Sequence, residues 1–153
     1  MFGISKTTLT VELKVFIAAL WWGSLTTLGF FVVPMLFGNL ATPAMAGNMA
    51  AKLFAVQTWV SVTCGLLLLL LLKPKSMPNF SVAGVKYTYG AIIFVVSGIL
   101  LALLATFGVS PRIVARENLM LWHAVGSAMY VLQWGCAGVV LYKLAAPQQG
   151  RTN

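Results

Sequence analysis

Residues 15–37 read VFIAALWWGSLTTLGFFVVPMLF, a run of 23 residues without a charged side chain. An apolar helix rises about 1.5 Å per residue and needs roughly 20 residues to cross the hydrocarbon layer of a bilayer. The run is therefore long enough to span a membrane. The apolar core of a signal peptide has only about 7 to 15 residues, so we expect this segment to remain in the protein as a membrane span.

Three further uncharged stretches follow, and short clusters of charged residues separate them. Residues 53–72 make up a stretch of 20 residues, and residues 87–111 and 118–142 make up two stretches of 25. Only 8% of the chain is charged, whereas a soluble domain has about a quarter. The sequence predicts an all-α fold, an integral membrane four-helix bundle that forms a single domain over residues 1–153. The expected spans are about 15–37, 51–72, 87–107 and 119–142.

The distribution of basic residues predicts the orientation of the bundle. Four spans put both termini on the same side of the membrane, and short loops rich in Lys and Arg stay on the cytoplasmic side. Seven basic residues fall on the side of the termini and three on the other side. The seven are Lys6, Lys14, Lys73, Lys75, Lys86, Lys143 and Arg151, and the three are Lys52, Arg112 and Arg116. We therefore expect both termini in the cytoplasm.

Three of the spans carry polar or small residues at intervals of three or four, which places each set on one helix face. The sets are Trp22, Thr26 and Gly29 on the first span, Gln57, Ser61 and Cys64 on the second, and His123, Ser127, Tyr130, Trp134 and Gly138 on the fourth. We expect these faces to meet inside the bundle. Two interpretations stay open: the polar groups form hydrogen bonds between helices, or they line a cavity open to the non-cytoplasmic surface.

The cavity interpretation predicts a binding pocket beneath the break that Pro34 makes in the first helix. A guanidinium turned into this pocket would favour an anionic group such as a lipid phosphate or a carboxylate, whereas a guanidinium turned outward would reach the lipid headgroups. The residues expected to converge there are Gln57, Arg112, His123, Ser127 and Tyr130.

Other classes of function find less support in the residues. The chain has no nucleophile and base at a readable spacing and no metal-binding histidine pair, so we expect no catalytic residues and no enzymatic activity. Haem or copper at His123 is a minor alternative, because a lone histidine needs a second ligand, and we expect no cofactor. Cys64 and Cys136 fall inside spans and fit the role of small hydrophobic residues. The basic residues flank spans and do not form one soluble face, so we expect no nucleic-acid partner.

Three short motifs resemble the transmembrane protein 205-like family: GFFVVPMLF at residues 29–37, the pair Pro111-Arg112, and WHAVGS at residues 122–127. The bacterial members of this family are four-span proteins with a domain of unknown function of the DUF4149 type. The resemblance covers about residues 12–142 and implies a four-span fold in the bacterial inner membrane. Human relatives have a long insertion between the arginine and the histidine, which this chain lacks. The positions carried over are Pro34, Phe37, Pro111, Arg112, His123 and Ser127, with Pro34, Phe37 and Pro111 in structural roles.

These observations predict a non-catalytic envelope protein with a polar pocket near the non-cytoplasmic surface, which binds a lipid, a partner or a small anion. One alternative is a small oligomeric transporter or channel, and another is a membrane protein that binds haem or copper through His123. The expected partners are the lipid bilayer and either further copies of the chain or another membrane protein.

Overall fold

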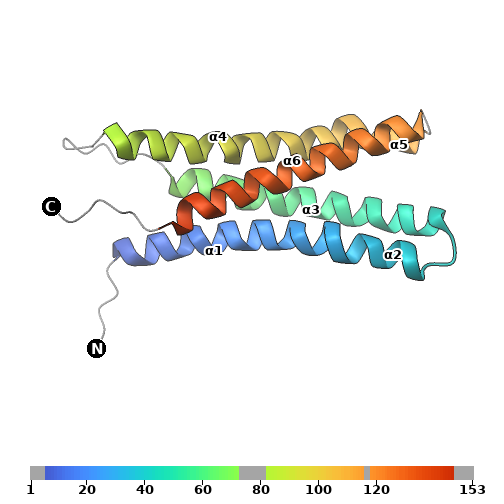
Figure 1. Cartoon of the computed structure of the whole chain (residues 1–153), viewed down its shortest axis with the longest axis horizontal. Helices are drawn as coiled ribbons and strands as arrows, with labels where there is room; N and C mark the ends of the chain where they lie inside the picture. Colours follow the sequence, from blue (N-terminus) through green and yellow to red (C-terminus); the bar gives the residue numbers. More distant parts are fainter. Residues whose placement is uncertain (1–5, 73–81, 116–117, 147–153) are drawn as a thin grey trace.

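The computed structural model describes residues 6–72, 82–115 and 118–146, and these residues form helices and turns without a β-strand. Four long helical rods lie side by side, and two of them each contain a π-helical turn (Figure 1). In chain order the elements are α1 (Lys6–Thr27), η1 (Leu28–Val32), α2 (Val33–Asn39), α3 (Pro43–Leu71), α4 (Val82–Leu104), η2 (Ala105–Val109), α5 (Ser110–Val114) and α6 (Leu119–Ala145). The predicted all-α four-helix bundle is confirmed.

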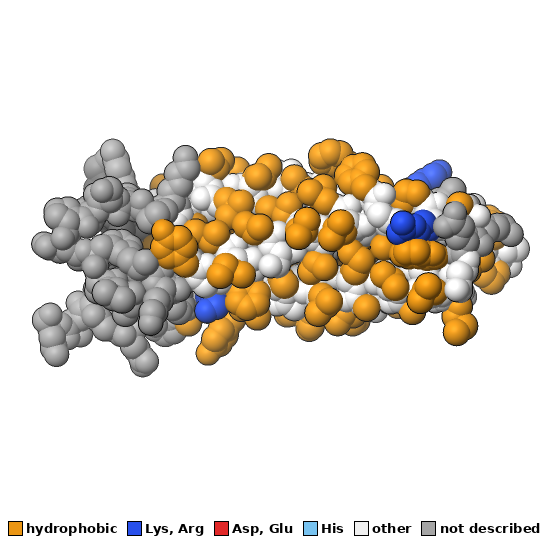
Figure 2. Space-filling model, turned by 90° about the horizontal axis from the view of Figure 1, so that it is seen from above, with side chains coloured by type: hydrophobic (Ala, Val, Ile, Leu, Met, Phe, Trp, Pro, Cys, Tyr) orange, Lys and Arg blue, Asp and Glu red, His pale blue; other side chains and the backbone are white. Residues whose placement is uncertain are grey.

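The four rods are long and apolar enough to cross a membrane, and they turn large apolar side chains outward. Phe16, Trp59, Ile93 and Leu132 are exposed, one on each rod, and hydrophobic side chains cover most of the face seen in Figure 2. A surface of this kind is stable in lipid and not in water. The protein is a multi-pass membrane protein. Its candidate spans are Leu9–Asn39, Pro43–Leu71, Tyr89–Ile113 and Leu119–Ala145.

Helical backbone extends beyond the predicted bounds of all four spans, and the start of the second span and the end of the third are two examples. The second span was expected to begin at residue 51, but α3 begins at Pro43, eight residues earlier. The Thr42 hydroxyl accepts a hydrogen bond from the Met45 backbone N–H (3.3 Å), and Pro43 occupies the first helical turn, where its missing N–H is not needed. The third span was expected to end at Phe107, but helical backbone continues through η2 and α5 to Val114.

Both π-helical turns lie shortly before a proline. In η1 the N–H of Val33 donates to the carbonyl of Leu28, five residues earlier, and Pro34 follows directly. In η2 the N–H of Ser110 donates to the carbonyl of Ala105, and Pro111 follows. Each of these two rods therefore accommodates its proline by a wider turn and continues as a helix. Neither proline ends its helix.

Each rod packs against two neighbours, in the cyclic order α1, α3, α4, α6. The half of the bundle that contains the start of α1 and the end of α6 has a closely packed apolar core. Close approach is possible there because Gly98 has no side chain: a Cβ at Gly98 would lie 2.7 Å from the Trp21 ring. The largest fully buried apolar side chains of the described residues are Trp21, Leu25, Leu68, Val95 and Val140.

Candidate ligand-binding cavity

A cavity of about 460 Å³ lies in the opposite half of the bundle, among α2, α3, α5 and α6. In this half the rods separate into two pairs, because α2 packs on α3 while α5 packs on α6. Both π-helical turns contribute to the walls, through Gly29 and Phe30 of η1 and Ala105, Thr106 and Val109 of η2. The backbone irregularities near the two prolines thus lie beside the cavity.

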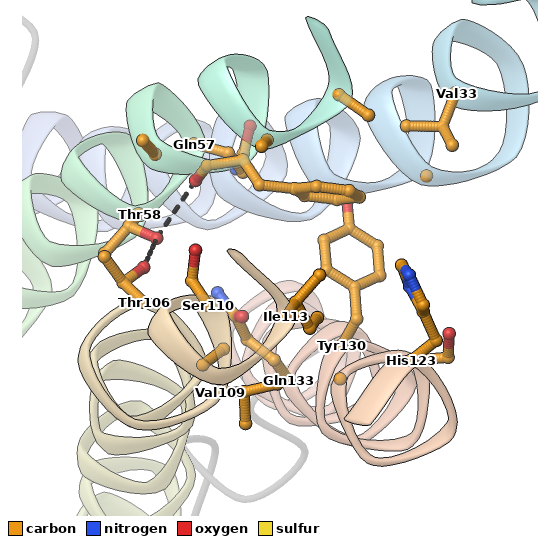
Figure 3. Close-up of a pocket in the computed structure, with 18 of the residues that line it drawn as sticks. Val33, Gln57, Thr58, Thr106, Val109, Ser110, Ile113, His123, Tyr130 and Gln133 are labelled. Carbon is orange, nitrogen blue, oxygen red and sulfur yellow. Dashed lines mark hydrogen bonds between the residues drawn. The ribbon is translucent and has the colours of Figure 1, made fainter. Parts of the chain in front are cut away.

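The inner end of the cavity reaches the middle of the bundle. Gln57 and Gln133 are each the fifteenth residue of their helices, so both lie about 20 Å from the helix start. Both side chains line the cavity and are almost fully buried, with 7% and 4% of their surface exposed. Thr58 and Thr106 also line this end, and their hydroxyl oxygens are 2.7 Å apart. We call Gln57, Thr58, Thr106 and Gln133 the inner polar group (Figure 3).

The outer end of the cavity contains His123, Ser127 and Phe37. His123 is the fifth residue of α6 and lies about 6 Å from the helix start, far from the inner polar group. The side chains of His123 and Ser127 are exposed, and no hydrogen bond joins either of them to another described residue. This end can therefore present polar atoms to a bound molecule.

Tyr130 crosses between the two pairs of rods from its position on α6 (Figure 3). Its hydroxyl donates a hydrogen bond to the backbone carbonyl of Leu25 (2.7 Å), and its ring packs edge-on against Phe54 with the centroids 5.2 Å apart. The ring fits only because residue 29 is glycine: a Cβ at Gly29 would collide with it. Tyr130 thus connects α6 to α1 and forms part of the cavity wall.

The polar faces expected on the first and fourth spans do meet. The indole N–H of Trp134 donates to the Thr26 hydroxyl (2.9 Å), and a Cβ at Gly138 would lie 3.0 Å from the Trp22 indole nitrogen. These contacts form direct links between α1 and α6, as the hydrogen-bonding interpretation requires. The outer part of the same α6 face, with His123, lines the cavity. Each interpretation therefore describes one part of the face.

Arg112 does not join the other four residues predicted for the pocket. Gln57, His123, Ser127 and Tyr130 line the cavity, whereas the Arg112 guanidinium lies 4.3 Å from the centre of the Trp122 ring and is exposed. The electron-rich face of an indole attracts a cation, and this contact holds Arg112 on the outside of the α5–α6 pair. The inward position of Arg112 was wrong, and with it the expected fixed positive charge. Binding by the remaining four residues stays a prediction.

Several polar residues that line the cavity were not predicted, among them Thr58, Thr106 and Gln133. Gln57 donates to Ser24 (2.9 Å), and Gln133 donates to Ser61 (2.9 Å). Thr106 was treated as part of an apolar span, although it pairs with Thr58. A search for amide and hydroxyl side chains at similar depths on neighbouring spans would have found these pairs.

A family model described as a domain of unknown function, DUF4149, matches residues 16–121. The chain belongs to this family. The DUF4149 match includes α2, α3 and α5 but ends at the third residue of α6, so His123, Ser127 and Tyr130 lie beyond it. The predicted relation to a DUF4149-type family is confirmed, and the likeness to transmembrane protein 205 stays a resemblance. Among curated proteins and among solved structures, no match to the DUF4149 chain was found.

Within the described residues, no three His, Cys, Asp or Glu side chains come together as a metal site would require. Cys64 and Cys136 are free thiols, and Cys64 is buried. Arg116 and Glu117, the charged neighbours of Asn118 at the start of α6, lie outside the described residues, as do Lys73, Lys75 and Arg151.

Proposed function

We propose that this DUF4149 protein is a non-catalytic membrane protein that binds a small amphipathic molecule in the cavity. The observation that carries the proposal is the combination of apolar walls with a polar inner end. Ligand sites typically enclose about 300 to 1,000 Å³ and combine an apolar lining with a few polar groups, and this cavity of about 460 Å³ has both features.

The position of the opening supports a ligand that arrives from the lipid. Phe30, Phe37 and Val131 line the cavity and are also exposed on the side of the bundle. All three belong to membrane-spanning rods, so a cavity that opens between them faces the hydrocarbon or its boundary. A molecule dissolved in the bilayer can therefore reach the cavity without crossing water.

The proposed setting is the bacterial inner membrane with both termini in the cytoplasm. The support is the excess of basic residues on the side of the termini together with membership of the DUF4149 family. In that orientation the outer end of the cavity, with His123, faces the non-cytoplasmic side.

A binding protein fits the interior better than a channel within one copy does. The half of the bundle beyond the cavity is filled by fully buried side chains such as Trp21, Leu68 and Val95. These side chains block a path along the bundle axis. An oligomeric transporter would need a pathway between copies, for which the cavity gives no specific support.

The test compares two glycine variants. Gly47 lines the cavity and Gly38 does not, and a Cβ at either position meets no atom within 4 Å, so both accept a larger side chain. The wild type, Gly47→Phe and Gly38→Phe are purified in mild detergent, and native mass spectrometry measures the small molecules that each retains. We expect a stoichiometric ligand on the wild type and Gly38→Phe and its loss from Gly47→Phe. Equal retention by all three would contradict binding in the cavity.

A further inference from the structure

Two amide side chains at the inner end of the cavity keep unused hydrogen-bonding groups. The Ser24 hydroxyl donates to the Trp21 carbonyl (2.9 Å), so its oxygen accepts the hydrogen bond from the Gln57 amide nitrogen (2.9 Å). The Gln133 amide nitrogen donates to Ser61 (2.9 Å). A primary amide has two N–H hydrogens and one carbonyl oxygen, and these contacts use only one hydrogen of each. Each glutamine therefore keeps one donor and one acceptor without a partner among the described residues.

The two amide oxygens border open space. Among the described residues, Trp21 Nε1 is the only completely enclosed side-chain nitrogen or oxygen without a partner. The oxygens of Gln57 and Gln133 also lack a partner, so they are not completely enclosed, and both residues line the cavity. The two amides can therefore serve a ligand group that accepts a hydrogen bond, donates one or does both.

These unused groups lie in the middle of the bundle, far from its outer end. His123 precedes Gln133 by ten residues on α6, so the two positions are about 15 Å apart along the helix axis. Apolar side chains line the cavity at intermediate depths, as Ala51 and Phe54 do at the ninth and twelfth positions of α3. The cavity thus places its most deeply buried polar groups at the end that is farthest from the membrane surface.

An amphiphile can occupy such a cavity in two orientations. If its polar group stayed at the outer end beside His123, its chain end would cover the amides of Gln57 and Gln133 and leave their unused groups buried without partners. Burial of this kind is unfavourable. If its polar group lies at the inner end, that group forms the missing hydrogen bonds and the chain contacts the apolar walls. The inward orientation therefore suits both parts of the cavity.

The inner end offers no opposite charge to an ionised group. The cavity lining contains no charged side chain apart from the titratable His123 at its outer end. Arg112 lies outside on Trp122, and the described residues hold a single carboxylate, Glu12 near the start of α1. A charge buried without a partner is strongly disfavoured, so a group that reaches the inner end is uncharged.

Resting on the proposed binding function, we infer that the ligand is an uncharged amphiphile, such as a long-chain alcohol or primary amide, that binds with its polar group inward. The polar group forms hydrogen bonds with Gln57 and Gln133 in the middle of the membrane, and the chain extends towards the opening beside Phe37 and Val131. This orientation is opposite to that of a lipid whose headgroup stays at the membrane surface. The cavity therefore selects molecules that dissolve within the hydrocarbon and excludes lipids with charged headgroups.

Two photoreactive alcohols test the orientation. Both are dodecan-1-ols with a diazirine ring, at carbon 3 in one and at carbon 11 in the other, so light attaches either the hydroxyl end or the chain end to nearby residues. Each is added to phospholipid nanodiscs that hold the full chain, and peptide mass spectrometry identifies the labelled residues. We expect the carbon-3 probe to label residues 54–58 and 130–134, and the carbon-11 probe to label residues 33–37 and 123–127. Nanodiscs with Gly47→Phe give the background.

Unlabelled competitors of equal chain length test the need for an uncharged polar group. Dodecan-1-ol, dodecane, dodecanesulfonate and dodecyltrimethylammonium compete with the carbon-3 probe at equal mole fractions in the lipid, and the last two keep their charge in any surroundings. One net hydrogen bond corresponds to about five- to tenfold in affinity, so we expect dodecan-1-ol to compete at least about fivefold more strongly than dodecane. We expect both ions to compete at least about tenfold more weakly than the alcohol.

Two variants assign the preference to the amides. Gln57→Met and Gln133→Met each replace an amide with an apolar side chain of similar length, and we expect the alcohol-to-dodecane ratio to fall about threefold or more in each. Dodecane should still compete in a folded variant, which distinguishes a lost polar contact from a misfolded protein. Thr63→Val also removes a polar group, but at an exposed position outside the cavity, and should leave the ratio unchanged.

The outcomes separate the inference from the function on which it rests. If neither probe labels the wild type above the Gly47→Phe background, ligand binding in the cavity is wrong. If the probes label the cavity but the carbon-3 probe attaches at the outer end, the cavity binds ligands and the inward orientation is overturned. Competition by dodecane or by either ion that equals that of the alcohol would overturn the need for an uncharged polar group. An unchanged alcohol-to-dodecane ratio in both glutamine variants would also overturn the inference.

Discussion

Replacing Gly29 with alanine should destabilise the bundle, although alanine is normally the better helix former. Alanine in place of glycine within a helix stabilises by about 0.5 to 1 kcal/mol. At Gly29 the added Cβ collides with the Tyr130 ring and lies 3.2 Å from its hydroxyl oxygen. Overpacking costs about 1 to 3 kcal/mol, and displacing the hydrogen bond from Tyr130 to the Leu25 carbonyl costs about another 1 kcal/mol. We expect a net loss of about 1 to 3 kcal/mol.

The assay is reversible unfolding in mixed micelles by titration with a denaturing detergent, followed by circular dichroism. Gly47→Ala is the matched control, because a Cβ at Gly47 meets no atom within 4 Å, and it should stabilise by about 0.5 to 1 kcal/mol. A second measurement places Gly29→Ala in a Tyr130→Ala background, where the penalty should disappear. If Gly29→Ala stabilises the wild type as much as Gly47→Ala does, the close contact between Gly29 and Tyr130 is refuted.

Three further substitutions test single contacts. Thr26→Val removes the acceptor of the Trp134 indole N–H and should cost about 1 to 3 kcal/mol in the same unfolding assay, and an unchanged midpoint would argue against that hydrogen bond. Thr42→Ala removes the cap of α3 and should cost about 1 kcal/mol, whereas Thr42→Asn should restore most of it. Arg112→Gln removes the contact with Trp122, should cost at most about 1 kcal/mol, and should leave the retained ligand unchanged in native mass spectrometry. Loss of ligand from Arg112→Gln would show that this arginine acts in binding.

The membrane fold was predictable because the bilayer limits where charged residues can lie. A span needs roughly 20 residues without a charge, and this requirement marks all four helices in the sequence. The helix ends were predicted less accurately, because apolar character does not determine where a helix begins or ends. Residues 43–50 contain small and turn-forming residues and were expected to be a connection, yet the Thr42 cap and Pro43 begin α3 there. Capping depends on one or two side chains and is easily missed in a hydropathy profile.

The residues of the candidate site could be predicted where several of them share one face of a single helix. Periodicity on single helices identified Gln57, His123, Ser127 and Tyr130, and all four line the cavity. Periodicity contains no information about which residue of a neighbouring helix meets a given side chain. Thr106 lies in an apolar stretch, and Ser110, the polar residue four positions later that also lines the cavity, falls beyond the predicted end of the span at Phe107. The two residues were therefore not recognised as one helix face.

The direction of Arg112 shows a different limit of sequence information. The residue lies at a helix end from which its long side chain can turn inward or outward, and the sequence alone supported both. The decision depends on Trp122, which lies ten positions later and comes within reach only after the chain has turned from α5 into α6. Placing the guanidinium on the outside removes the fixed positive charge on which the prediction of an anionic ligand depended.

The two prolines explain why the cavity lies in one half of the bundle. Pro34 and Pro111 each lack the N–H that an α-helix requires, and the ring of each would clash with the carbonyl one turn earlier. The chain responds with the wider turns η1 and η2, on two rods that run in the same direction and at places where both turns line the cavity. Beyond these turns α2 packs against α3 and α5 packs against α6, so the rods separate into two pairs. Without that separation, the polar side chains at the inner end would be enclosed in a packed core. The space beside them therefore results from the backbone geometry of η1 and η2.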